Sequence, residues 1–172
     1  MTYSKEKQEF LNCLKHYRHD WLNHIQIIKG YLSLDKAEKA QKYLDQVIIQ
    51  AHYESKISQL GDTDLAYFLL TYNWVQDKLM LDVEIEENDI EIHAIGVKYP
   101  YLYTWCKELT RIAEVHSTVH YDNRLSILVE VNPQVLTLTV EFLGGWDSKQ
   151  AVGSFEQLEP VSYTHLTLPT KA

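Results

Sequence analysis

The chain has 172 residues, of which 45% are hydrophobic and 23% charged, a composition typical of one large globular domain or two small ones. Sixteen basic and 24 acidic side chains give a formal net charge of −8, which argues against nucleic acid or an acidic membrane surface as a partner. Two cysteines cannot build a disulfide framework, no apolar signal segment begins the chain, and no apolar run is long enough to span a bilayer. We therefore expect a cytoplasmic protein.

The first sixty residues have the pattern of two long helices, because they contain one glycine and no proline. A helix is expected from about Lys5 to Leu32. A break at 33–35 follows, where Ser33 or Asp35, with Glu38 as a capping-box partner, can cap a second helix that ends near Gly61. In the first helix, heptad position a is assigned to Leu14, Trp21 and Ile28, and position d to Phe10, Tyr17, His24 and Tyr31.

The apolar stripe of this predicted hairpin would remain largely in water if the hairpin stood alone. Pairing of two hairpins in a homodimer would bury the stripe in a four-helix bundle. The alternative is that the second half of the same chain covers it. Gly30, inside the first helix, would permit the close approach of a partner or neighbouring helix, or a bend.

Residues 61–159 have the pattern of a small α+β domain. Apolar and acidic residues alternate after Leu79, and Ile90, Ile92 and Ala94 continue the alternation. Pro100 can begin a helix, and Asn132-Pro133 marks a turn between two strands. The fold class expected for the whole chain is therefore α+β. The expected elements of this domain are a helix over 64–78, a strand over 79–95, a helix over 101–115, and strands over 121–131 and 134–143.

Residues 160–172 are treated separately from the predicted domain. The run Pro160 to Thr170 resembles the translation of a transposase-type sequencing adaptor, although its alternating residues would also suit an edge strand. We expect this tail to be adaptor-derived, and the natural chain to continue differently after Glu159. On this interpretation the second domain is truncated.

His19 has the most informative position among the eight histidines. The heptad assignment places it at f, away from the apolar seam, with Asn23 and Gln26 on the same outer face. Leu22 falls at b, where a solvated helix face normally carries charge. The pattern fits a docking surface that contains a nucleophile, and it also fits a surface histidine with no function.

The string RHDWLN at Arg18 to Asn23, continued as HIQIIKGYLSL to Leu34, closely resembles the phosphoacceptor helix of the sporulation initiation phosphotransferase B family. The strings ESKISQL, from Glu54, and LAYFLLTYNW, from Leu65, resemble the same family. This resemblance implies a dimeric four-helix bundle. It also implies that His19 carries phosphoryl groups between aspartates of two response-regulator receiver domains in a sporulation-type phosphorelay.

The resemblance also suggests roles for the neighbours of His19. Asp20 would orient the imidazole or accept its proton, although it can equally be a plain solvated residue. Arg18 would steady phosphate charge, and Asn23 holds the position at which some related proteins orient a hydrolytic water. The receiver would supply Mg²⁺, so no cofactor or metal ligand is expected in this chain. The residues expected to contact the receiver are Arg18, Leu22, Asn23 and Gln26.

The second domain distinguishes a relay protein from a sensor kinase. Kinase ATP-binding domains of this kind use an asparagine-rich helix and glycine-bearing loops. The helix expected over 101–115 contains no asparagine, and the turn at Gly144-Gly145 is too short to enclose a triphosphate. We therefore expect a degenerate ATPase-like domain. The alternatives are a sensor-kinase fragment that autophosphorylates from ATP, and a non-catalytic dimeric scaffold that binds a receiver.

Overall fold

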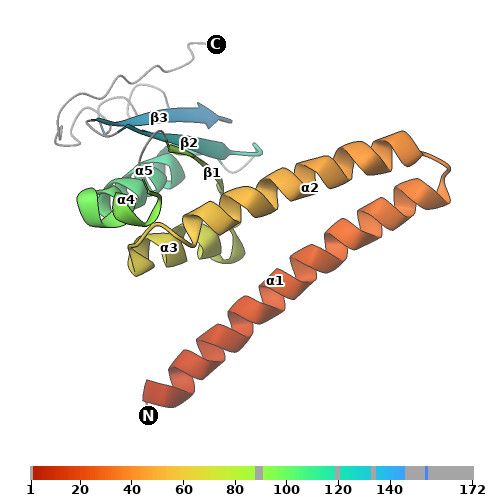
Figure 1. The fold of residues 1–172 in the computed structure, drawn as a ribbon, viewed down its shortest axis with the longest axis horizontal. Helices are drawn as coiled ribbons and strands as arrows, with labels where there is room; N and C mark the ends of the chain where they lie inside the picture. Colours follow the sequence, from red (N-terminus) through yellow and green to blue (C-terminus); the bar gives the residue numbers. More distant parts are fainter. Residues whose placement is uncertain (1, 88–90, 119–120, 133–134, 146–153, 155–172) are drawn as a thin grey trace. The chain divides into compact units, whose positions relative to one another are not determined.

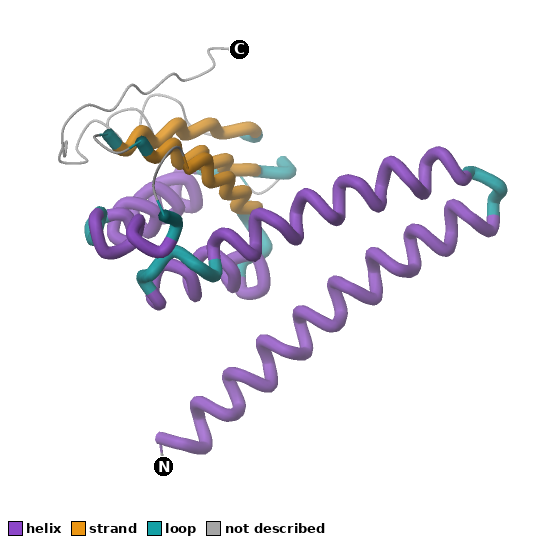
Figure 2. The backbone as a smooth tube through the Cα atoms, in the orientation of Figure 1, coloured by secondary structure: helices purple, strands orange, loops and turns teal. Residues whose placement is uncertain are grey.

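The computed structural model describes residues 2–87, 91–118, 121–132, 135–145 and 154. The chain divides into two compact units, Met1–Glu54 and Ser55–Ala172. Figure 2 shows that the first unit is built from helices, whereas the strands belong to the second. The predicted α+β class is confirmed. The predicted tail at 160–172 lies outside the described residues.

The first unit is a helical hairpin made by α1 (Thr2–Ser33) and most of α2 (Ala37–Ile57). Near the turn, His24 Nδ1 lies 2.9 Å from the Tyr43 hydroxyl, and the rings of Tyr31 and Tyr43 meet edge to face at 6.3 Å between centroids. Figure 1 shows the two helices closest at the turn and diverging away from it. Aromatic and polar contacts therefore hold the hairpin at its tip.

Ser33 and Asp35, in the turn between α1 and α2, have other roles than the predicted capping of α2. Asp35 adopts a left-handed conformation with φ of 53°, and the Lys36 amide donates to the Tyr31 carbonyl at 2.9 Å. This is a Schellman ending of α1, in which Asp35 takes the position usually held by glycine. Ser33 donates its hydroxyl to the Lys29 carbonyl at 2.9 Å. The predicted capping of α2 by Ser33 or Asp35 is wrong, because both residues complete α1.

The apolar stripe of α1 is only partly covered within one chain. The side chains of Ala40 and Val47 on α2 are buried, but Phe10 is 63% exposed and Trp21 37% exposed. Among the described residues outside its own helical turn, a Cβ atom placed on Gly30 would meet nothing within 4 Å, so no described helix approaches there. The approach of a partner helix at Gly30 stays a prediction.

In its described residues, the second unit is a sheet of three strands packed against the helices α3, α4 and α5. Strand order is β1-β2-β3, with β1 parallel and β3 antiparallel to the central β2. Figure 1 shows the helices gathered on one face of the sheet. The elements are α3 (Thr63–Val75), β1 (Met80–Glu87), α4 (His93–Lys98), α5 (Leu102–His116), β2 (Arg124–Val131) and β3 (Leu136–Leu143).

The first strand is shorter than the strand predicted over 79–95 from the alternation of apolar and acidic residues. Strand β1 ends at Glu87, and Ile90 lies outside the described residues. Ile92 is the residue that precedes α4 and Ala94 belongs to that helix, so their assignment to a strand is wrong. The Gly96 amide of α4 donates to the Leu60 carbonyl at 2.7 Å. This tertiary contact, which hydrophobic alternation does not reveal, fixes the short helix.

Strand β2 begins at Arg124, three residues after its predicted start, because Asn123 has another role. The buried Asn123 amide donates to the carbonyls of Lys78 (3.2 Å) and Thr118 (3.0 Å). Its side-chain oxygen accepts from the Gly145 amide at 3.1 Å. One buried side chain thus holds three connecting segments together, which fits the rule that buried polar groups are paired.

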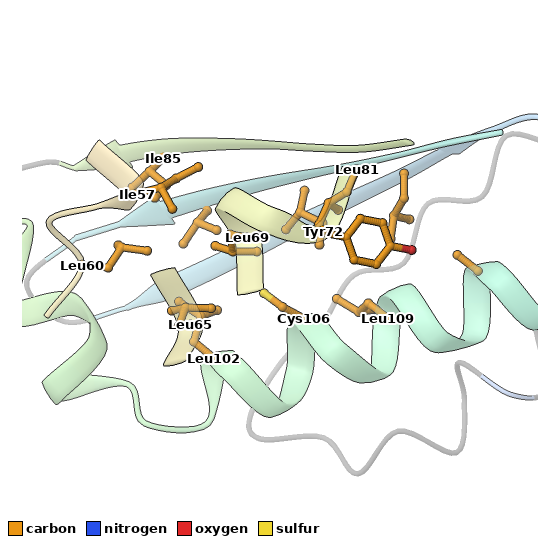
Figure 3. Packing of buried hydrophobic residues seen from close by; sticks show 14 of the residues in the cluster. Ile57, Leu60, Leu65, Leu69, Tyr72, Leu81, Ile85, Leu102, Cys106 and Leu109 are labelled. Carbon is orange, nitrogen blue, oxygen red and sulfur yellow. The ribbon is translucent and has the colours of Figure 1, made fainter. Parts of the chain in front are cut away.

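The core of the second unit lies between the sheet and its helices. Register pairs Leu81 of β1 with Leu125 of β2, and Leu125 with Phe142 of β3, so that their side chains share the inner face. Figure 3 shows these strands facing apolar side chains of α3 and α5. Cys106 of α5 is fully buried among them, and burial raises the pKa of its thiol to about 12. The cysteine is therefore a neutral packing residue.

The end of α2 and the turn that follows it also belong to this core. Ile57 and Leu60 are buried in the same cluster as the sheet residues, and Figure 3 places Ile57 beside Ile85 of β1. Lys56 donates its ammonium group to the Ile85 carbonyl at 3.2 Å. The boundary between the two compact units consequently falls inside α2, before Ser55.

Candidate functional site

His19 lies in the middle of α1, with its side chain 73% exposed. The exposure follows from helix geometry, because Trp21 lies two residues on and points about 200° around the helix axis. Trp21 meets the seam residues Tyr17 and His24 edge to face, at centroid distances of 6.2 and 6.1 Å. His19 is therefore exposed in this chain, on the side of α1 opposite to Trp21.

The two polar contacts of the His19 side chain are both made to the same ring nitrogen, Nδ1. Asn23 Nδ2, one turn further along α1, lies 3.2 Å from His19 Nδ1. Asp20 Oδ1 lies 3.4 Å from the same Nδ1 atom. Among the described residues, Nε2 has no hydrogen-bond partner. Two neighbours thus compete for Nδ1, while Nε2 is left without a protein partner among these residues.

The other residues predicted to contact a partner surround His19 on the same helix. Arg18, Leu22, Asn23 and Gln26 are all exposed, and Leu22 is 56% exposed. We call these four residues and His19 the docking face. Exposure within one chain does not by itself identify this face, because Phe10 of the seam is even more exposed. The direction of the side chains around α1 separates the two surfaces.

Sequence reasoning missed two contacts near the site. Asn23 was assigned to partner contact, whereas its amide reaches the His19 ring; the four-residue spacing on a helix could have revealed this. The hydrogen bond between His24 and Tyr43 joins two helices, and no spacing within one helix could have predicted it. The contact of Tyr43 with His24 therefore depends on how the two helices pack, and only the structure reveals it.

Two residues of the second unit that could have served a nucleotide site, Asn73 and Gly145, are engaged within the fold. Asn73, the single asparagine of α3, donates to the Leu81 carbonyl and accepts from the Leu81 amide, both at 2.8 Å. The Gly145 carbonyl accepts from the Thr118 amide at 2.8 Å and from its hydroxyl at 3.0 Å. With its amide held by Asn123, Gly145 has both backbone groups committed to structure.

A buried tyrosine of α3 is likewise part of the framework. Tyr72 donates its hydroxyl to a carboxylate oxygen of Glu114 on α5. Burial, together with the nearby Glu114 carboxylate, raises the pKa of Tyr72 well above its ordinary value, so the phenol stays protonated and continues to donate. The pair ties two helices of the second unit and offers no reactive group.

The described residues also show whether features of a metal site or of a membrane-spanning helix are present. No cluster of three or more histidine, cysteine, aspartate or glutamate side chains suited to a metal ion occurs in the described part of the chain. Over the same residues, none of the helices combines the length and apolar character that crossing a membrane requires.

Comparison with known proteins covers nearly the whole chain. Residues 1–60 match the family model described as Sensor_kinase_SpoOB-type, alpha-helical domain, and residues 62–167 match Sporulation initiation phospho-transferase B, C-terminal. A curated relative, Sporulation initiation phosphotransferase B of Bacillus subtilis (strain 168), is 30% identical over 154 residues, which is 87% of this chain and 77% of the relative. The chain therefore belongs to the sporulation initiation phosphotransferase B family.

Proposed function

We propose that this protein is a histidine phosphotransferase of a sporulation-type phosphorelay, with His19 as the phosphoacceptor. The observation that carries the proposal is an exposed imidazole on a helix, contacted by its neighbours at Nδ1 and not at Nε2, on a face with one apolar and several polar side chains. Its partners would be response-regulator receiver domains, which carry the phosphoryl group on an aspartate. Family membership supports this choice over a surface histidine with no function.

The proposed transfer needs little from this chain besides a positioned nucleophile. The Nε2 lone pair forms the N–P bond while the P–O bond to the receiver aspartate breaks, and the aspartate leaves as a carboxylate with the electron pair. Transfer to the second receiver is the reverse step with another aspartate. Mg²⁺ bound by the receiver would neutralise phosphate charge, so this chain would act without a cofactor of its own.

Asp20 and Arg18 would assist this step from the same helix. In the state with the proton on Nδ1, the Asp20 carboxylate accepts that hydrogen bond and stabilises the positive charge that the ring gains as Nε2 bonds to phosphorus. Arg18 is exposed next to His19 in the sequence and supplies positive charge toward a phosphoryl group. Neither residue forms a covalent bond in the reaction.

The second unit would act as a degenerate ATPase-like domain that does not supply phosphoryl groups. The engagement of Asn73 and of the Gly145 backbone within the fold supports this proposal over a sensor-kinase fragment. Radiolabelled ATP, offered with and without a labelled phospho-receiver, separates the functions. Label from the phospho-receiver alone supports the relay, label from ATP alone supports the kinase, and binding of a receiver without label supports the scaffold.

We further propose that two chains pair through the partly exposed apolar stripe of the hairpin to form a four-helix bundle. Melting temperature should then rise with protein concentration, because folding and association would be coupled. Trp21→Ala should lower stability by about 3–5 kcal/mol if the dimer buries the indole. Sedimentation beside the thermal melts checks both results, and a monomer whose melting does not depend on concentration would contradict the bundle.

Leu22→Glu is expected to weaken transfer from a phospho-receiver strongly while it changes stability by only about 0.5 kcal/mol. The side chain is exposed in this chain, but a receiver that reaches His19 must cover it. A carboxylate there would be desolvated and would face the receiver's acidic pocket. Receiver binding, label transfer and thermal melting measure the effects.

Leu34→Glu is the matched control for this variant, because Leu34 is an exposed leucine in the hairpin turn, outside the docking face. It should leave transfer unchanged. If Leu22→Glu unfolds the protein, or if both variants impair transfer equally, the docking face is misplaced.

A further inference from the structure

The two contacts to His19 Nδ1 require opposite protonation states of that atom. Asn23 approaches with its amide nitrogen, which can only donate, so Nδ1 must offer a lone pair and the ring proton must lie on Nε2. Asp20 approaches with a carboxylate oxygen, which accepts, so Nδ1 must then carry the proton. A neutral imidazole has one proton and cannot satisfy both neighbours at once.

These two arrangements differ in nucleophilicity. With Asn23 bonded, the Nδ1 lone pair is occupied and Nε2 carries the proton, so neither nitrogen offers a free lone pair. With Asp20 bonded, Nδ1 carries the proton and Nε2 has a free lone pair. The contact to Asn23, at 3.2 Å, lies within the usual hydrogen-bond range, whereas the contact to Asp20, at 3.4 Å, lies just beyond it. The geometry of the isolated chain therefore corresponds to the unreactive arrangement.

We propose that Asn23 is a positioning residue that holds the His19 imidazole in its unreactive tautomer until a partner draws the amide away. The inference rests on the proposed function, since it concerns regulation of the same histidine. Asn23 would thus keep the phosphoacceptor unreactive in the absence of a receiver, and Asp20 would take over Nδ1 when the amide leaves.

The position of Asn23 explains how docking would release the ring. Asn23 is exposed on the docking face, one turn beyond His19 and next to Leu22. A receiver that covers this face can offer the amide a new acceptor. Loss of a single neutral hydrogen bond then suffices to change the tautomer, and such a bond contributes little enough for a partner to replace it.

The tautomer can be measured directly in the whole protein. Two-bond proton–nitrogen correlation NMR of the ring shows which nitrogen of His19 carries the proton. Asn23→Leu should raise the Nδ1-protonated population, and adding Asp20→Leu should reverse this rise by removing the acceptor. Asn12→Leu is the matched control, because it makes the same substitution about three turns before Asn23 on the same helix, outside hydrogen-bond reach of His19. An unchanged tautomer in Asn23→Leu, or an equal change in Asn12→Leu, overturns the proposal.

Reactivity is tested with phosphoramidate, a small phosphoryl donor that needs no receiver. The Nε2 lone pair attacks phosphorus, the P–N bond breaks and ammonia leaves. Asn23→Leu should be phosphorylated on His19 roughly two- to tenfold faster than the wild type, the change expected for one lost neutral hydrogen bond. Equal rates would overturn the proposal.

A parallel measurement with labelled phospho-receiver and wild-type protein tests the proposed function separately. Absence of transfer in that arm refutes the relay, whatever the phosphoramidate rates are. Transfer in that arm with equal phosphoramidate rates leaves the relay standing and overturns the role of Asn23 alone.

Discussion

A His19→Gln variant is expected to take up no label from a phospho-receiver while it keeps the fold of the wild type. Glutamine is a good helix former, and the side chain it replaces is mostly exposed, so stability should change by only about 0.5 kcal/mol. The glutamine amide has no nucleophilic ring nitrogen, so the transfer step loses its phosphoryl carrier completely. Gel autoradiography after incubation with labelled phospho-receiver measures the loss, and circular dichroism measures the fold.

His52→Gln serves as the matched control for this variant. His52 is an exposed histidine on α2, outside the docking face, so its replacement should leave transfer intact. Label that persists on His19→Gln would show that another residue accepts the phosphoryl group. Loss of label from both variants would point to a general effect of histidine removal.

Gly96→Ala is expected to destabilise the second unit by about 1–3 kcal/mol, the usual range for overpacking. A Cβ on Gly96 would lie 2.5 Å from the Asp62 Cβ and 2.6 Å from both the Asp62 amide nitrogen and the Leu60 carbonyl oxygen. Two of these three atoms are backbone, so the site can relieve the clash only by moving α4 away from Leu60. Urea unfolding followed by circular dichroism measures the free energy of unfolding.

Gly30→Ala is the matched substitution with the opposite expected sign. Apart from the backbone of the helix itself, no described residue lies within 4 Å of the added carbon, and alanine is favoured over glycine inside a helix by roughly 0.5–1 kcal/mol. The variant should therefore be more stable than the wild type. If it instead weakens self-association in sedimentation, a partner helix approaches Gly30. Equal effects of the two substitutions would contradict the packing described for Gly96.

The longer elements were predictable because their periodicity is local. Helix α1 was expected over Lys5 to Leu32 and is observed over Thr2–Ser33, since a repeating apolar stripe specifies a helix without reference to the rest of the fold. Helix α4 was missed because six residues are too few for a helical period, and because its packing depends on a distant carbonyl, that of Leu60. The cap of α2 was misassigned because Asp35 suits both an N-cap and a left-handed helix ending.

The candidate site was largely predictable because it lies on one helix. Helical geometry alone places Leu22 and Asn23 beside His19 and directs Trp21 to the other side. The sequence does not specify which atoms are in contact. The competition of Asp20 and Asn23 for the same ring nitrogen of His19 could therefore be recognised only in the structure. Contacts between helices, such as that of His24 with Tyr43, depend on the hairpin register.

The burial of Ile57 and Leu60 in the second unit limits how halves of related proteins can be exchanged. A chimera joined between residues 60 and 61, at the edge of the family matches, would give the sheet of one relative the last helical turn of another. Both apolar side chains, and the Leu60 carbonyl that binds Gly96, would then come from the wrong parent. A junction just before Ser55 keeps these groups with the sheet and helix that evolved beside them.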